Sequence, residues 1–150
     1  MFTERRIESA TPTISTSIYA SGDHVGTLMT FEAPISSRGG LVEHVTVIDK
    51  SKQKSILNIL FFSGSPTLLS ADNAALDISD DDMANLCLGY VPIAAADYKD
   101  LANSSVATVS TIKMAIERTT TAFYAVILSG GTPTYAGTTD LVIKLGIRSA

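Results

Sequence analysis

The chain has 150 residues, of which 45% are hydrophobic and 17% are charged, and its formal net charge is −4 at pH 7. This length is typical of one domain with a continuous core, and the excess of hydrophobic over charged residues excludes an intrinsically disordered chain. No basic stripe with interleaved aromatic residues is present, so direct binding to nucleic acid is not supported. The low share of charge also favours an assembly that buries part of the surface.

Neither a membrane span nor a secretion signal is predicted. The longest strongly apolar stretches, residues 56–62 and 86–96, are interrupted by polar, glycine or proline residues. Neither reaches the roughly 20 residues that span a bilayer. The charged N-terminal residues are followed by no apolar region of a signal peptide. Cys87 is the single cysteine, which excludes an internal disulfide and fits a reducing compartment.

Residues 1–24 are interpreted as an N-terminal arm and residues 25–150 as a single β-sandwich domain. The arm is charged at its start and rich in Ser and Thr over 11–17, where a proline disfavours a helix. Gly22 marks a turn, after which a short strand is predicted over 25–31.

The middle of the chain predicts a β-hairpin that follows a loop at 33–40. A strand is predicted over 41–48, a polar linker over 49–54, and a second β-rich run, apolar on both faces, over 55–62. Two such runs around a short polar linker are typical of a hairpin. The second run is expected to lie between layers or against a neighbour.

A short helical turn and an edge strand are predicted next. Ser79 and Asp82 have the spacing of a capping box, which predicts a helical turn that continues to Leu86. A strand is expected over 88–93, and Pro92 near its end places that strand at a sheet edge.

The last third of the chain is rich in strand signals. Residues 97–101 predict a short turn of helix or a loop. Residues 106–117 fit either a strand or a helix, with β-propensity favouring the strand. A strand is predicted over 119–128, and strict alternation over 141–147 predicts a final strand with one buried face.

Taken together, the elements predict an all-β protein. Many short strands with Gly/Pro turns indicate a two-sheet sandwich or a barrel. We favour a jelly-roll-like antiparallel β-sandwich with one or two short helical turns and the N-terminal arm.

The acidic run from Asp72 to Asp82 is the clearest candidate for chemistry, because clustered carboxylates can bind calcium. The spacing and the glycine of an EF-hand are missing, however, and acidic residues in a first helical turn favour the helix dipole. Helix capping is therefore the preferred interpretation, with cation binding as the alternative.

No catalytic, cofactor-binding or metal-ligating residues are predicted. His24 and His44 are the only histidines, too few for a cupin-like metal centre, and are expected to be surface or half-buried residues. Cys87 lies between two leucines and is interpreted as a small buried hydrophobe. Ser63 lies in no G-x-S-x-G motif, and the paired glycines are too short for a phosphate loop.

Several segments together resemble the head decoration, or cement, proteins of tailed bacteriophages. They are GGLVEHVTVID (39–49), KSILNILFF (54–62), DNAALDI (72–78), YAV (124–126), GTPTY (131–135) and DLVIKLGI (140–147). The resemblance implies a jelly-roll fold and a structural role on the outer surface of the virion head, with assembly in the host cytoplasm. The implied partners are the major capsid protein, whose subunits the chain would bridge, and further copies of itself as a dimer or trimer. The resemblance implies no enzyme activity, no cofactor and no contact with nucleic acid or membrane.

Two groups of residues are candidate partner contacts. The arm lies outside the resemblance, and we hypothesise that it reaches a neighbouring subunit through four residues: Phe2, Arg5, Arg6 and Ile7. Lys50, Lys52 and Lys54 alternate along the expected hairpin tip and could contact an acidic partner surface, although a solvated turn is the preferred interpretation.

Two other functions compete with head decoration. A carbohydrate- or receptor-binding module of a phage fibre is disfavoured because the chain has no Trp and only five Tyr. A jelly-roll enzyme is disfavoured because the histidine cluster and a plausible acid–base pair are missing.

Overall fold

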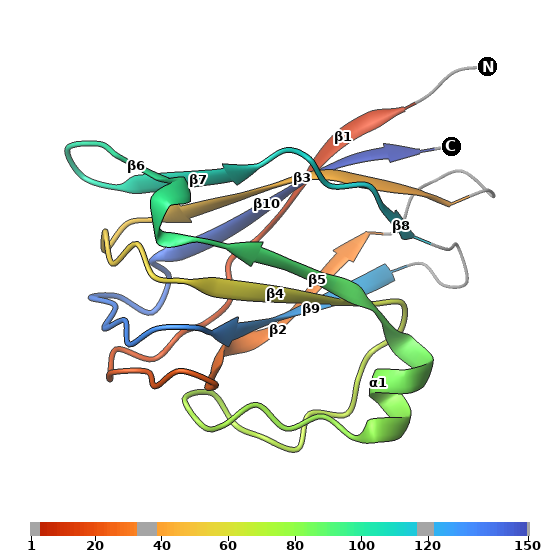
Figure 1. Cartoon of the computed structure of the whole chain (residues 1–150), viewed down its shortest axis with the longest axis horizontal. Helices are drawn as coiled ribbons and strands as arrows, with labels where there is room; N and C mark the ends of the chain where they lie inside the picture. Colours follow the sequence, from red (N-terminus) through yellow and green to blue (C-terminus); the bar gives the residue numbers. More distant parts are fainter. Residues whose placement is uncertain (1–3, 33–38, 117–121, 150) are drawn as a thin grey trace.

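The computed structural model describes residues 4–32, 39–116 and 122–149, which form two antiparallel sheets packed face to face (Figure 1). The strands are β1 (Arg5–Ala10), β2 (His24–Glu32), β3 (Gly40–Asp49), β4 (Leu57–Phe62), β5 (Cys87–Ile93), β6 (Tyr98–Asp100), β7 (Ser105–Val109), β8 (Met114–Ile116), β9 (Ala122–Ser129) and β10 (Leu141–Ser149). The helices are α1 (Asp80–Leu86) and the 3₁₀ turn η1 (Ala95–Asp97). Within the described residues, no helix has the length and apolar character needed to cross a membrane.

The strand pairs are nested along the chain. One sheet has the order β1-β10-β3-β7-β6, with β8 also pairing β3, and the other has the order β2-β9-β4-β5. The first strand thus pairs with the tenth, the second with the ninth, the third with the seventh and the fourth with the fifth. A long hairpin rolled into two sheets in this way has the connectivity of a jelly roll. The predicted class, an all-β antiparallel sandwich, is confirmed.

The predicted hairpin between 41–48 and 55–62 is wrong. Both runs are strands, but β3 belongs to one sheet and β4 to the other, so residues 50–56 cross between the sheets. Alternation of apolar residues identifies a buried face without identifying the neighbouring strand, because the same pattern suits a partner in either sheet.

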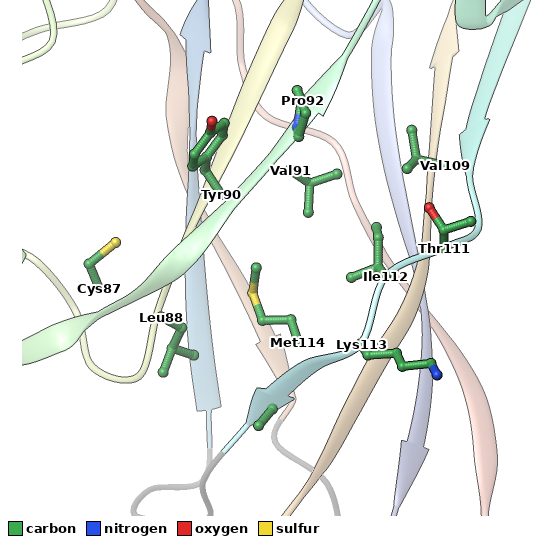
Figure 2. Close-up of a pocket in the computed structure, with 11 residues that line it drawn as sticks. Cys87, Leu88, Tyr90, Val91, Pro92, Val109, Thr111, Ile112, Lys113 and Met114 are labelled. Carbon is green, nitrogen blue, oxygen red and sulfur yellow. The ribbon is translucent and has the colours of Figure 1, made fainter.

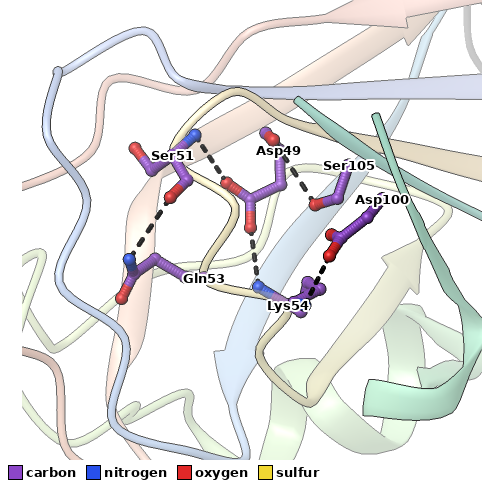
Figure 3. Close-up of polar contacts among 6 residues, drawn as sticks. All are labelled: Asp49, Ser51, Gln53, Lys54, Asp100 and Ser105. Carbon is purple, nitrogen blue, oxygen red and sulfur yellow. Dashed lines mark hydrogen bonds and ion pairs between the residues drawn. The ribbon is translucent and has the colours of Figure 1, made fainter. Parts of the chain in front are cut away.

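The crossing is organised by the buried side chain of Asp49 (Figure 3). Its carboxylate accepts hydrogen bonds from the backbone N–H groups of Ser51 and Lys54, each at 2.9 Å. Lys52 and Lys54 both adopt left-handed backbone conformations, with φ of 54° and 50°. Burial raises the pKa of Asp49, against the effect of these N–H donors. The chain therefore turns tightly around one carboxylate before it enters the second sheet.

The interpretation of residues 1–24 as an arm is wrong for the part that the structure describes. Residues 5–10 form β1, which pairs with β10 along its whole length. Further along, Ile14 and Tyr19 are 2% and 0% exposed and belong to the core. The sandwich therefore includes residues well before 25, because the charged side chains of β1 conceal a strand with one half-buried face.

The other predicted elements are largely confirmed. In α1, the Ser79 hydroxyl caps the helix by accepting a hydrogen bond from the Asp82 N–H at 3.2 Å. The edge strand predicted at 88–93 is β5. The stretch 106–117, for which β-propensity favours a strand over a helix, overlaps the strands β7 and β8. The turn of helix or loop expected over 97–101 is wrong, because residues 98–100 form the strand β6, which pairs with β7, and the 3₁₀ turn η1 ends at Asp97. The strand predicted over 119–128 is confirmed as β9 from Ala122 onward, and its residues 119–121 lie outside the described residues, as do residues 33–38 of the predicted loop.

The final strand has the buried face that its alternation predicts. Its apolar residues Leu141, Ile143, Leu145 and Ile147 are at most 1% exposed. On the opposite face, Lys144 is exposed. Because β10 lies between β1 and β3, the strand is a central member of its sheet.

Gly146 allows the ring of His44 to lie against β10. A Cβ atom at this position would overlap the His44 imidazole. We expect Gly146→Ala to lower the free energy of unfolding by about 1–3 kcal/mol, because either the ring or the backbone must shift. Urea denaturation measures this cost. In a His44→Ala background the same substitution should be nearly neutral, and an equal cost in both backgrounds would contradict the explanation.

Candidate functional site

The two sides of the sandwich, where edges of the two sheets lie near each other, differ in chemistry. At the side formed by β1 and β2, the Arg6 guanidinium donates a hydrogen bond to the Glu32 carbonyl at 2.9 Å and forms an ion pair with Glu8, also at 2.9 Å. This polar bridge closes that side. At the other side, a groove of about 730 Å³ lies between β5 and residues 109–115.

The groove is lined mainly by apolar side chains. Leu88 and Val91 come from β5, and Ile112 and Met114 come from the opposite segment, so that the four side chains gather between the two sheets (Figure 2). Among the residues that line the groove, Lys113 is the one charged side chain. The groove therefore presents apolar side chains together with almost as much accessible polar surface, and it carries one positive charge, that of Lys113.

A second hollow continues this surface around the edge of the sheet. It has a volume of about 380 Å³ and is lined by Leu60, Leu128 and Met83, together with Cys87 and Tyr90 of β5. Cys87 and Tyr90 also line the groove, so the two depressions meet at β5. We call the residues that line either depression the β5 edge surface. Tyr90, at 61% exposed, is the most exposed large hydrophobic side chain of this surface.

The sequence of β5 explains why this edge is open. The strand reads CLGYVPI and carries no charge. Gly89 has φ of 136°, next to an irregularity in the β4–β5 register, and Pro92 lacks an N–H. Bulges and prolines are the features that prevent another strand from adding to an edge. A partner would therefore bind this surface through side chains rather than by extending the sheet.

The predicted contact residues do not form one surface. Arg5 pairs with Arg148 at one end of β10, whereas Lys50 follows Asp49, which pairs with Leu141 at the other end. A strand of nine residues, such as β10, separates its ends by roughly 30 Å.

The individual contact residues also differ in availability. Ile7 is 59% exposed, Arg6 is held by its polar bridge, and the Lys54 ammonium forms an ion pair with Asp100 at 2.9 Å. Lys50 is exposed and Lys52 is half-buried. Phe2 lies outside the described residues.

Most of the acidic residues, histidines and the cysteine that the sequence offers as candidates for chemistry have structural roles. The carboxylates of Asp72 and Asp82 hold different parts of the chain. Asp72 accepts a hydrogen bond from the Tyr19 hydroxyl, and Asp82 accepts one from the Thr67 N–H, both at 2.7 Å. Among the described residues, no three His, Cys, Asp or Glu side chains form a group that could hold a metal ion. The expectation for His24 is wrong, because the residue is 2% exposed. Cys87 is half-buried at the surface, not buried as expected.

Sequence reasoning missed the residues of the β5 edge surface. Pro92 correctly predicted an edge strand, and that was the available signal. The position of Ile112 and Met114 beside β5 depends on the order of the strands, which no local pattern specifies.

The fold and this surface define the class of protein: a jelly-roll-like sandwich with one polar side and one open apolar side. The sequence matches no protein-family model, and the comparison with curated proteins gave no significant match.

Proposed function

We propose that this chain is a structural virion protein that decorates and stabilises the outside of an icosahedral phage head. In this role it binds the major capsid protein, bridges its subunits and has no catalytic activity or cofactor. The observation that carries the proposal is the β5 edge surface, which continues across a sheet edge and is mostly apolar in its outer hollow. Contiguous exposed apolar surface on a folded domain is typical of a protein–protein contact.

The energetics of such a role suit this surface. Burial of apolar area contributes about 25 cal/mol per Å², so a small contact by one copy is weak. Many copies on one shell, or copies joined as a dimer or trimer, multiply weak contacts into stable occupancy. Lys113 at the rim of the groove would lie against a carboxylate of the shell, which would fix the orientation of the contact.

The resemblance to head decoration proteins supports the same role. Its longest segments, 39–49, 54–62 and 140–147, fall largely on β3, β4 and β10, which are framework strands of the two sheets. The resemblance therefore concerns the framework of the two sheets, and we propose the β5 edge surface as the part that contacts the capsid protein.

Quantitative mass spectrometry of purified virions tests the proposal. We expect the chain to be present in a fixed ratio to the major capsid protein. Heads made without its gene should lack the chain and should be less stable. Its absence from virions would overturn the proposal. Its restriction to the tail tip would instead favour a carbohydrate- or receptor-binding fibre module.

A further inference from the structure

A buried histidine lies at the start of β2. His24 is 2% exposed, and neither ring nitrogen has a hydrogen-bond partner of ordinary geometry among the described residues. Its strand neighbour in β9 is Leu128, which offers no polar group to the ring. Buried polar atoms without partners are rare in proteins and call for an explanation.

The segment 70–76, between β4 and α1, covers this residue through backbone hydrogen bonds. The His24 N–H donates to the Ala74 carbonyl, and the Asn73 N–H donates to the His24 carbonyl, both at 2.8 Å. The Leu76 N–H donates to the Gly22 carbonyl at 2.9 Å. We call residues 70–76 the cover segment.

Asp72 fixes the cover segment to the rest of the sandwich. One oxygen of its carboxylate accepts hydrogen bonds from the Tyr19 hydroxyl and the Gly26 N–H, both at 2.7 Å. Next to it, Asn73 adopts a left-handed conformation with φ of 63°. Besides these bonds, the cover segment has one isolated antiparallel bridge, between Ala75 and Asp23, and a hydrogen bond from the Asn73 amide to the Ser15 hydroxyl at 3.4 Å. It is not a strand of either sheet.

A proton on His24 would oppose this arrangement. Burial lowers the pKa of His24, and the Asp72 carboxylate and the backbone of Ser70 act in the opposite direction without compensating. The other titratable groups nearby are already bonded, because Tyr19 donates to Asp72 and the Asp23 carboxylate accepts from the Ala20 N–H.

The lowered pKa of His24 determines how pH affects opening of the cover segment. Because the ring binds protons less readily when it is covered than when it is in water, an opened state takes up more protons below the ordinary pKa of 6.5. Opening is therefore favoured as the pH falls.

We propose that the cover segment is an acid-released cover: protonation of His24 detaches residues 70–76 and exposes the ring while both sheets stay folded. The strand ladders do not depend on the bonds that are lost. Local opening of this kind requires only that a segment has fewer stabilising contacts than the core. This inference does not rest on the proposed function.

Hydrogen-exchange mass spectrometry of the full chain at pH 7.5, 6.5 and 5.5 tests the proposal. After correction for intrinsic rates, we expect protection of the Asn73 and Leu76 amides to fall by up to about tenfold between pH 6.5 and 5.5, because the uptake of one proton changes an equilibrium by at most tenfold per pH unit. Amides of β3 and β10 should keep their protection. Unchanged protection of the cover segment down to pH 5.5 would overturn the proposal.

His24→Leu provides the matched control, since it removes the proton-binding ring and keeps an apolar side chain at the buried position. In this variant the loss of protection on acidification should disappear, and an equal loss would contradict the role of His24. If the variant does not fold, NMR titration of the His24 ring in the unaltered chain decides. We expect its titration to coincide with the loss of cover-segment signals, and a titration that leaves those signals unchanged would also refute the proposal.

Discussion

A chain carrying Tyr90→Asp should fold normally and bind phage heads about a hundredfold more weakly than the unaltered chain. Tyr90 is 61% exposed, so its replacement removes little buried area within the domain itself. In the proposed contact, by contrast, the new carboxylate would be buried against apolar side chains, and a buried charge without a partner is strongly unfavourable. Titration of the labelled chain onto heads that lack it measures the effect, and thermal unfolding verifies the fold.

Ile18→Asp is the matched control for this substitution. Ile18 is 63% exposed and lines neither depression of the β5 edge surface, so the same charge is introduced at similar exposure elsewhere. We expect the control to bind heads as the unaltered chain does. Equal weakening by both substitutions, or full binding by Tyr90→Asp, would show that another surface makes the contact.

Phe61→Ala should lower the free energy of unfolding by about 3–5 kcal/mol. The Phe61 ring is 0% exposed and belongs to the core between the two sheets, so its loss leaves a cavity. For a domain of this size we expect Tm to fall by roughly 6–20 °C, as measured by differential scanning calorimetry.

Leu60→Ala tests whether the large cost comes from the inward face of β4. Leu60 is the preceding residue on the same strand, but it is half-buried and faces the outer hollow. We expect a cost of about 1 kcal/mol for this substitution. If both substitutions had the same cost, the core would not lie where the alternation of β4 places it.

The strands with a strong apolar pattern could be predicted from the sequence. Leu141, Ile143, Leu145 and Ile147 predict a strand with one buried face, and the structure confirms it. The central place of this strand in its sheet could not be predicted from the alternation. β1 gives no such signal, because charged side chains occupy its first two positions and Ile7 points to solvent, so the strand carries no apolar stripe. Its partner β10 determines its conformation, and that partner is more than 130 residues away along the chain.

The candidate site was less predictable than the fold. Val91, Ile112 and Met114 are ordinary strand residues in the sequence, and they form a groove because two sheet edges meet beside them. Local sequence also cannot show that the chain crosses between the sheets after Asp49 instead of forming the predicted hairpin. The crossing depends on hydrogen bonds to the buried Asp49 carboxylate and on left-handed conformations at Lys52 and Lys54, which local propensity does not favour. Sites made by the packing of distant edges leave little signal in any one segment.

Cryo-electron microscopy of the heads, with and without the chain, tests the central claim most directly. We expect jelly-roll density on the outer surface of the shell, with β5 and residues 109–115 against the major capsid protein. Heads without such density, or density in which the β5 edge surface faces solvent, would contradict it.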